Sequence, residues 1–169
     1  MGGTYLEENL LILGSGGYGK MVAEAAEAMG KWELIDCLDD EPEDRFILEN
    51  STDFANRYRY AFPAVEENKL RLVLMKALKK AGYLVPVIIH PSAVVSHSAH
   101  IDPGSAVLAG AVVSAGAEVG ACCVVGIGAL IEYDAFLEKG VQLCAGAIVK
   151  ENTNVPEATV IKSGKLYAR

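Results

Sequence analysis

The chain has 169 residues, of which 51% are hydrophobic and 22% charged, and its formal net charge is −7. This length suffices for one ordinary domain or two small ones, and the apolar content is ample for a core. The acidic balance, without any run of Lys and Arg, argues against nucleic acid or an anionic membrane surface as the partner.

The sequence lacks the usual features of membrane insertion, secretion and metal binding. Its apolar runs fall short of the ~18 residues of a membrane span, and its start has neither the basic nor the apolar region of a signal peptide. The four cysteines are too irregular for a disulfide framework and form no Cys-x-x-Cys pair. We therefore expect a reduced, cytoplasmic protein without a bound metal.

The first elements expected along the chain are a strand, a glycine-rich turn and a helix. Residues 10–13 are wholly apolar, which predicts a buried strand. Residues 14–19 follow as Gly-Ser-Gly-Gly-Tyr-Gly, and apolar residues then recur at helical spacing over 20–29 until Gly30. This order is typical of a Rossmann-like βαβ unit that binds phosphate.

The next elements continue the α/β pattern. A second strand is expected over 33–40, where it ends in two aspartates, and residues 59–62 are a candidate third strand. Residues 40–56 are acidic and predict a surface loop. Apolar residues at helical spacing over 70–81 predict an amphipathic helix. Its other face is basic, which we interpret as a solvated surface, and carries Lys69, Arg71, Lys76, Lys79 and Lys80.

The glycine-rich loop predicts a nucleotide sugar as ligand. Its glycines let the backbone approach a phosphate, and the free amides of the following helix favour negative charge. The domain is short for a dinucleotide fold, which favours a nucleotide sugar over NAD. The two aspartates end the second strand either as ribose or base contacts or as a solvated strand end. The predicted substrate-binding residues are Gly14, Ser15, Gly16, Gly17, Tyr18, Gly19, Asp39 and Asp40.

After residue 88 an aliphatic residue recurs at every sixth position. The series is Ile89, Val95, Ile101, Val107, Val113, Val119, Val125, Ile131, Leu137, Leu143, Val149, Val155 and Ile161. A small residue precedes most of these by two positions, and glycine, asparagine or aspartate often follows by three. This pattern predicts a hexapeptide parallel β-helix, because a strand alternates in twos and a helix repeats near 3.6. We therefore divide the chain into 1–88 and 89–169.

Both halves together resemble the bacterial acetyltransferases of sialic acid O-acetylation and of UDP-4-amino-sugar N-acetylation. The matching segments are residues 11–20, 38–40, 89–96, 109–113 and 128–134. The resemblance implies a left-handed β-helix, a homotrimer and a sugar nucleotide, linked to UDP or CMP, on the N-terminal domain. It also implies acetyl-CoA between neighbouring β-helices, and a histidine between two acidic residues that takes the proton of the acceptor.

The chain departs from this family at the catalytic position. Laid against the family pattern, the histidine falls on Tyr133, between Glu132 and Asp134. A phenol, with an ordinary pKa of about 10, is a poor general base near pH 7. Three hexads to a coil would stack Tyr133 beside Glu151 and predict a hydrogen bond between them.

Other polar positions of the family site have changed as well. The family's Asn-Thr pair falls on Gly126 and Ile127, a second histidine on Gln142, and the histidine of the glycine loop on Tyr18. The resemblance further implies contacts with acetyl-CoA at Gln142, Gly146 and Ala147. The family pattern continues through further coils before a closing segment, and the resemblance implies that much of the CoA contacts those coils, which are missing here.

The leading interpretation is a trimeric, sugar-nucleotide-binding member of this family in which acetyl transfer is doubtful. One alternative is an active transferase that uses acetyl-CoA to acetylate an amino or hydroxyl group of a nucleotide-linked sugar in surface-glycan biosynthesis. Another is a structural trimer subunit, since small outward residues such as Ala115, Ala121 and Ala145 suit close packing.

Overall fold

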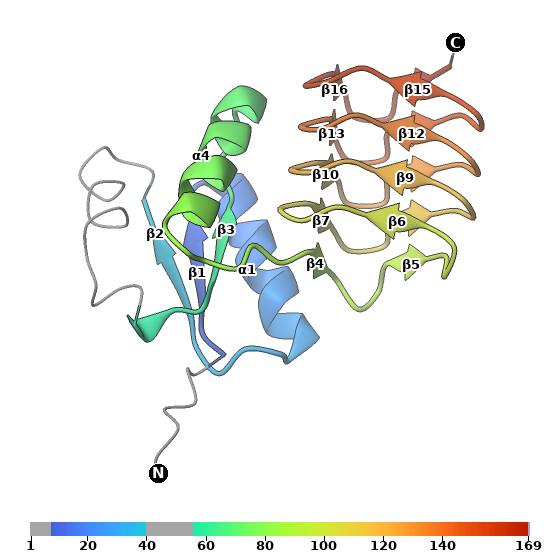
Figure 1. Cartoon of the computed structure of the whole chain (residues 1–169). Helices are drawn as coiled ribbons and strands as arrows, with labels where there is room; N and C mark the ends of the chain where they lie inside the picture. Colours follow the sequence, from blue (N-terminus) through green and yellow to red (C-terminus); the bar gives the residue numbers. More distant parts are fainter. Residues whose placement is uncertain (1–7, 40–55, 169) are drawn as a thin grey trace.

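The computed structural model describes residues 8–39 and 56–168. In its N-terminal domain a parallel sheet has the strand order β2-β1-β3 and is packed with two helices (Figure 1). The elements are β1 (Leu10–Leu13), α1 (Gly17–Met29), β2 (Ile35–Leu38), β3 (Tyr60–Pro63) and α4 (Asn68–Lys80). The predicted acidic loop and Asp40 lie outside the described residues.

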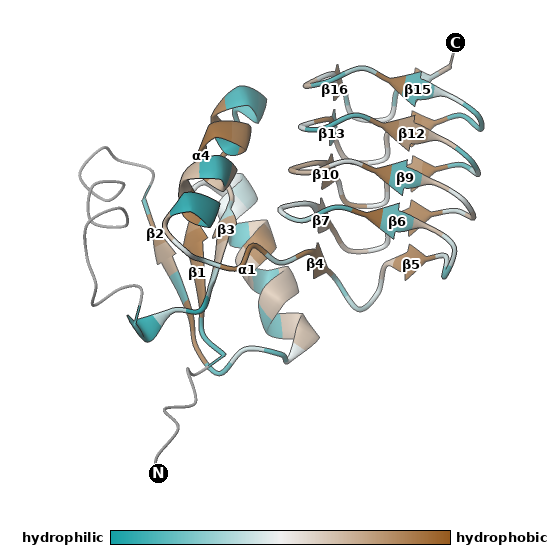
Figure 2. Cartoon of the chain, viewed as in Figure 1, coloured by the Kyte–Doolittle hydropathy of each residue, from teal (hydrophilic) through white to brown (hydrophobic). Residues whose placement is uncertain are grey.

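The central strand β1 is buried on both faces of the sheet, as its apolar sequence predicts (Figure 2). Leu10 and Ile12 pack in a cluster with α1, whereas Leu11 and Leu13 pack on the other side with Leu78 of α4. Helix α1 begins at Gly17, three residues earlier than the helical spacing indicated, because the glycine turn leads directly into it. It ends, as expected, at a left-handed Gly30 with φ of 61°.

The C-terminal domain is a parallel β-helix of two-residue strands spaced six residues apart. The strands are β4 (Ile88–Ile89), β5 (Val94–Val95), β6 (His100–Ile101), β7 (Ala106–Val107), β8 (Val112–Val113), β9 (Glu118–Val119), β10 (Val124–Val125), β11 (Leu130–Ile131), β12 (Phe136–Leu137), β13 (Gln142–Leu143), β14 (Ile148–Val149), β15 (Asn154–Val155), β16 (Val160–Ile161) and β17 (Leu166–Tyr167). Each pairs in parallel with the strand one coil away, as Leu130 does with Ile148.

The strands stack into three sheets along the β-helix (Figure 1). The interdomain sheet, in the order β16-β13-β10-β7-β4, faces the N-terminal domain. The outer sheet has the order β17-β14-β11-β8-β5, and the polar sheet the order β15-β12-β9-β6. The predicted fold, a βαβ domain followed by a parallel β-helix, is thereby confirmed.

The hexad residues form the interior of the β-helix. Every position of the aliphatic series is the second residue of its strand, and those from Val107 onward are buried. The coils turn at left-handed residues that are also six apart. Most of these are glycines, but Cys122, Asp134, Asn152 and Ala158 also have positive φ. The aspartate and the asparagine follow the expected turn chemistry, whereas the cysteine and the alanine do not.

The two domains share a packed interface. The outward side chains of Ile88, Ala106 and Val124, on the interdomain sheet, are buried in the same cluster as α1. Strand β4 begins at Ile88, so the predicted boundary after residue 88 falls inside this strand. Within the described ranges, no helix is both long and apolar enough to cross a membrane.

Candidate functional site

The glycine-rich loop is shaped by two close backbone contacts. Gly14 has φ of 121°, and a Cβ on it would overlap the carbonyl oxygen of Ala64 at the end of β3. A Cβ on Gly19 would overlap the carbonyl oxygen of Gly14. These two glycines are therefore required by packing. A Cβ on Gly16 would meet no atom within 4 Å, so this part of the loop faces open space.

A cavity of about 310 Å³, the loop pocket, lies against this turn. Its lining residues are Gly14, Ser15, Gly16, Tyr18, Ala64, Val65, Glu66, Glu67 and Leu70. In the part of the chain that the structure describes, no side chain caps helix α1, so the amides of its first turn can hydrogen-bond a ligand. The Ser15 hydroxyl donates to Asp39, which places this carboxylate beside the loop.

A second cavity, of about 250 Å³, lies between the two domains and is called the interdomain pocket. Its lining residues are Tyr18, Met21, Glu66, Leu108, Val124, Gly126, Ile127, Gln142, Leu143, Cys144 and Ala145. Four of the five positions that depart from the family's polar residues therefore meet in one cavity, and the fifth, Tyr133, does not line it. Sequence reasoning missed Glu66 and Cys144, because neither belongs to a motif.

Tyr18 and Glu66 line both pockets and so connect them. The Tyr18 side chain is buried, and its hydroxyl has no hydrogen-bond partner among the described residues. Burial raises the pKa of this phenol well above its usual range, although the nearby Arg71 opposes the shift. Tyr18 is therefore a neutral, largely apolar wall where the family has a histidine.

The family's base position lies at a different place on the β-helix. Tyr133 follows β11 at a corner between the outer and polar sheets, and its side chain is 51% exposed. The neighbouring Glu132 pairs with Lys150, with Oε2 2.9 Å from Nζ, and accepts a hydrogen bond from the Glu151 amide. Asp134 adopts the left-handed turn conformation with φ of 54°.

The hydrogen bond predicted between Tyr133 and Glu151 does not occur among the described residues. Glu151 pairs instead with Lys150, with Oε2 3.0 Å from Nζ. Contacts with Glu132 and with the Lys150 ammonium lower the pKa of Glu151 to about 2. Hydrogen bonds to the same two carboxylates raise the pKa of Lys150. The corner is therefore a charged surface network from which Tyr133 stands apart.

The predicted site residues thus fall into two groups. Tyr133 and its two acidic neighbours are absent from the lining of the interdomain pocket. Gln142 lines that pocket, whereas Gly146 forms a left-handed corner with φ of 65°. Ala147 is fully buried inside the β-helix, and its amide already donates to the Cys144 carbonyl. Its side chain is thus not available to acetyl-CoA.

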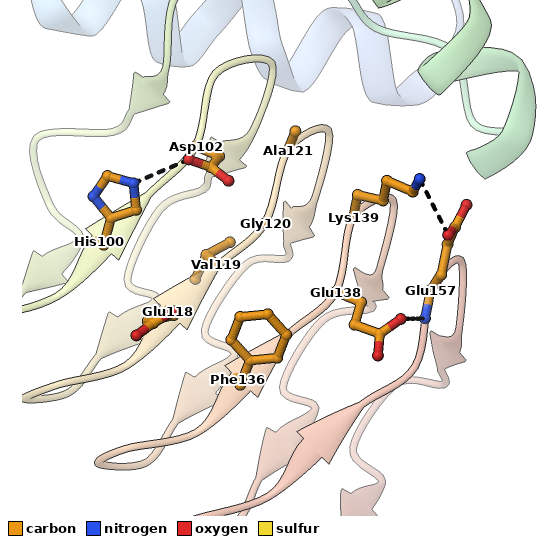
Figure 3. Close-up of a pocket in the computed structure, with 10 residues that line it drawn as sticks. All are labelled: His100, Asp102, Glu118, Val119, Gly120, Ala121, Phe136, Glu138, Lys139 and Glu157. Carbon is orange, nitrogen blue, oxygen red and sulfur yellow. Dashed lines mark hydrogen bonds and ion pairs between the residues drawn. The ribbon is translucent and has the colours of Figure 1, made fainter.

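Another cavity, of about 440 Å³, lies on the polar sheet (Figure 3). Its lining residues are His100, Asp102, Glu118, Val119, Gly120, Ala121, Phe136, Glu138, Lys139 and Glu157. His100 pairs with Asp102 and Lys139 with Glu157, and none of the predicted site residues lines it. Among the described residues no group of three or more His, Cys, Asp or Glu is arranged to hold a metal ion.

The N-terminal domain matches a known protein family. Residues 9–78 match the family described as the PglD N-terminal domain. No curated protein sequence matches the chain.

Solved structures match both domains. The acetyltransferase domain of PglB from Neisseria gonorrhoeae FA1090 is 34% identical, with a TM-score of 0.87, over 94% of this chain and 82% of that one. The same domain in complex with acetyl coenzyme A is 32% identical, with a TM-score of 0.86, over 95% and 82%. A perosamine N-acetyltransferase from Caulobacter crescentus, in complex with CoA and GDP-perosamine, is 22% identical, with a TM-score of 0.74, over 95% of this chain and 89% of that one. At this identity the likeness shows the fold alone. This chain therefore belongs to the hexapeptide-repeat sugar acetyltransferase family.

Proposed function

We propose that this protein binds a nucleotide sugar at the loop pocket and does not transfer an acetyl group by the family's histidine mechanism. The observation that carries the proposal is the contrast between the loop pocket and the base position at Tyr133. The loop pocket keeps an open helix amino terminus, whereas the base position is a tyrosine, exposed in the single chain, whose acidic neighbour Glu132 is paired with Lys150.

Nucleotide binding is supported by the local physics of the loop. Helix α1 has 13 residues, so its amide dipoles add up at the amino terminus, where a diphosphate would be favoured. Gly16 leaves space for a ligand to approach the main chain. Asp39, hydrogen-bonded by Ser15, is placed to contact a ribose or a base. A UDP- or CMP-linked sugar is our proposed ligand, and the Caulobacter protein, whose structure contains GDP-perosamine, adds GDP to the nucleotides to be tested.

The absence of transfer follows from acid–base chemistry. Acyl transfer to an amine or hydroxyl needs a group that accepts the acceptor's proton near neutral pH. A histidine meets this need when a carboxylate orients it. Here the position is Tyr133, and its neighbour Glu132 is committed to Lys150. The interdomain pocket likewise offers Gln142 and Gly126 where the family has polar or titratable groups.

The alternative, an active enzyme with acetyl-CoA as co-substrate, is favoured by one comparison. The Neisseria domain, at 32% identity, was solved in complex with acetyl coenzyme A. In that case another group would act as base, and Glu66 is the carboxylate that lines the interdomain pocket. Acetyl-CoA would then lie near Gln142 and the Gly146 corner.

We also propose a homotrimer in the cytoplasm. The outward residues of the outer sheet are all aliphatic, namely Val94, Val112, Leu130, Ile148 and Leu166. Two of them, Val94 and Leu166, are 63% and 59% exposed. A second copy packed on this stripe would remove it from water. Leu130→Arg should therefore yield monomers in light scattering, whereas a monomeric wild-type protein would contradict the assembly.

Calorimetric titration with UDP-, CMP- and GDP-sugars tests the ligand assignment. Gly17→Asp places a carboxylate at the first residue of α1 and should weaken binding at least about tenfold, because it repels a phosphate there. Ala28→Asp adds the same charge at the exposed far end of this helix and should leave affinity unchanged. Failure of every nucleotide sugar to bind, or equal binding by Gly17→Asp, would overturn the proposal.

A further inference from the structure

Arg71 occupies an unexpected place in the structure. The helical spacing assigned it to the solvated basic face of α4, but the residue is completely buried. This assignment was wrong, because α4 packs on the β-helix as well as on its own sheet. The guanidinium has no carboxylate partner among the described residues, and its hydrogen bonds are to carbonyl oxygens and one amide side chain.

The guanidinium hydrogen bonds join three segments of the chain. Nε donates to the Cys122 carbonyl at 2.8 Å, and Nη1 donates to the carbonyls of Val65 at 2.9 Å and Glu66 at 3.3 Å. Nη2 donates to Asn68 Oδ1 at 2.8 Å and to the Gly140 carbonyl at 3.5 Å. All five N–H groups are thereby used. One cation thus links the wall of the loop pocket to two successive coils.

The rest of α4 follows the same edge of the β-helix. Its docking edge consists of the left-handed corners Gly104, Cys122, Gly140 and Ala158, one from each of four coils. Met75 contacts the first two corners, with its Sδ 2.9 Å from Cys122 Sγ. Leu72 lies against Gly140, and Asn68 Nδ2 donates to the Ala158 carbonyl at 3.1 Å. The helix therefore spans four coils, and Arg71 lies near the middle of the contact between α4 and the docking edge.

We propose that Arg71 is the positioning residue that fixes the N-terminal domain against the β-helix and thereby sets the width of the interdomain pocket. The two walls of this pocket belong to different domains, with Tyr18 and Glu66 on one side and Gln142 on the other. Arg71 bonds the Glu66 main chain directly and lies over the Tyr18 ring, with its Cζ 5.6 Å from the centroid. Its effect on ligand affinity rests on the proposed function, but its role in the interface does not.

Lysine cannot replace this group. The planar fork of arginine reaches five oxygens in fixed directions, whereas an ammonium has three donors at one point. Arg71→Lys should therefore keep only part of the hydrogen bonds across the interface, and Arg71→Met should keep none of them. Four of the five oxygens left without their donor are buried, and the Glu66 carbonyl is part-buried, so the domains should part locally to let water reach them.

Thiol labelling separates opening of this interface from unfolding of the β-helix. In a Cys37→Ser, Cys144→Ser background two thiols remain, Cys122 under α4 and Cys123 inside the β-helix. Arg71→Met should raise the labelling rate of Cys122 at least about tenfold and leave that of Cys123 unchanged, because only the interface opens. Burial raises the pKa of the Cys122 thiol and Arg71 partly opposes this, so removal of Arg71 alone would make the thiol less reactive. The rise in labelling is expected in spite of this effect.

The control is Lys76→Met, an exposed residue of the same helix, which should label like the parent. Parallel rises at both thiols, or no change at either, would overturn the inference. If Arg71→Met is too unstable to isolate, Arg71→Lys should give an intermediate Cys122 rate. A nucleotide sugar, where it binds, should bind the Met variant more weakly. If the wild-type protein binds no nucleotide sugar, this result contradicts the proposed function. The labelling result would still test the role of Arg71 in the interface.

Discussion

The interior ladder of the β-helix permits a quantitative prediction at Leu137. This side chain is fully buried and stacks between Val119 of the coil before and Val155 of the coil after. Leu→Ala substitutions in cores cost about 2–5 kcal/mol, and the cost is largest where the site cannot collapse. Here the coils are held about 4.8 Å apart by main-chain hydrogen bonds, so we expect about 4 kcal/mol.

Urea unfolding followed by circular dichroism measures this loss. With a slope of about 2 kcal/mol per molar urea, the midpoint of Leu137→Ala should fall by about 2 M. Glu118→Ala, on the outward exposed position of the neighbouring strand, should change stability by less than about 0.5 kcal/mol. A loss below about 1 kcal/mol at Leu137, or an equal loss in both variants, would refute the stacked interior.

Three other predictions follow from the site and its surroundings. Gly19→Ala should unfold the N-terminal domain or shift its melting markedly, since its Cβ would overlap the Gly14 carbonyl; a wild-type melting curve would contradict this packing. Burial raises the pKa of Cys122 from 9.0 to about 11, so its contribution to stability is complete below pH 9 and lost as pH rises to 11. That loss amounts to about 3 kcal/mol, and Cys122→Ala should therefore show a shallower alkaline decline in melting temperature. Tyr133→His should remain inactive in acetyl transfer, because Gly126, Ile127 and Gln142 stand in the interdomain pocket where the family has an Asn-Thr pair and a second histidine; measurable turnover would show that the tyrosine alone blocks catalysis.

The β-helix was predictable because one physical requirement repeats along it. Each hexad must place an aliphatic residue inside and a left-handed residue at a corner, so Ile131 and Gly128 follow from counting in sixes. Cys122 and Ala158 also adopt the corner conformation. Neither cysteine nor alanine favours this left-handed conformation. Both corners lie against α4, and the hexad repeat alone does not indicate this contact.

The interface between the domains was not predictable from local patterns. A charged residue on a helix is usually solvated, and the burial of Arg71 depends in part on carbonyl oxygens that a domain distant in sequence supplies to it. Glu66 and Cys144 line the interdomain pocket for the same reason, since that cavity forms between segments far apart in the chain. The glycine loop was recognisable, but the structure divides its glycines into those that pack and those that face open space.

The most direct test of the central claim is the rate of acetyl transfer by the wild-type protein. The acceptor is a nucleotide-linked amino sugar that titration has first shown to bind, and acetyl-CoA is supplied in excess. We predict a rate at the uncatalysed background throughout the range from about pH 6 to 9, because the family's base position is Tyr133 rather than a histidine. Saturable turnover above this background would contradict the account, and its loss in Tyr133→Phe would assign it to the Tyr133 position.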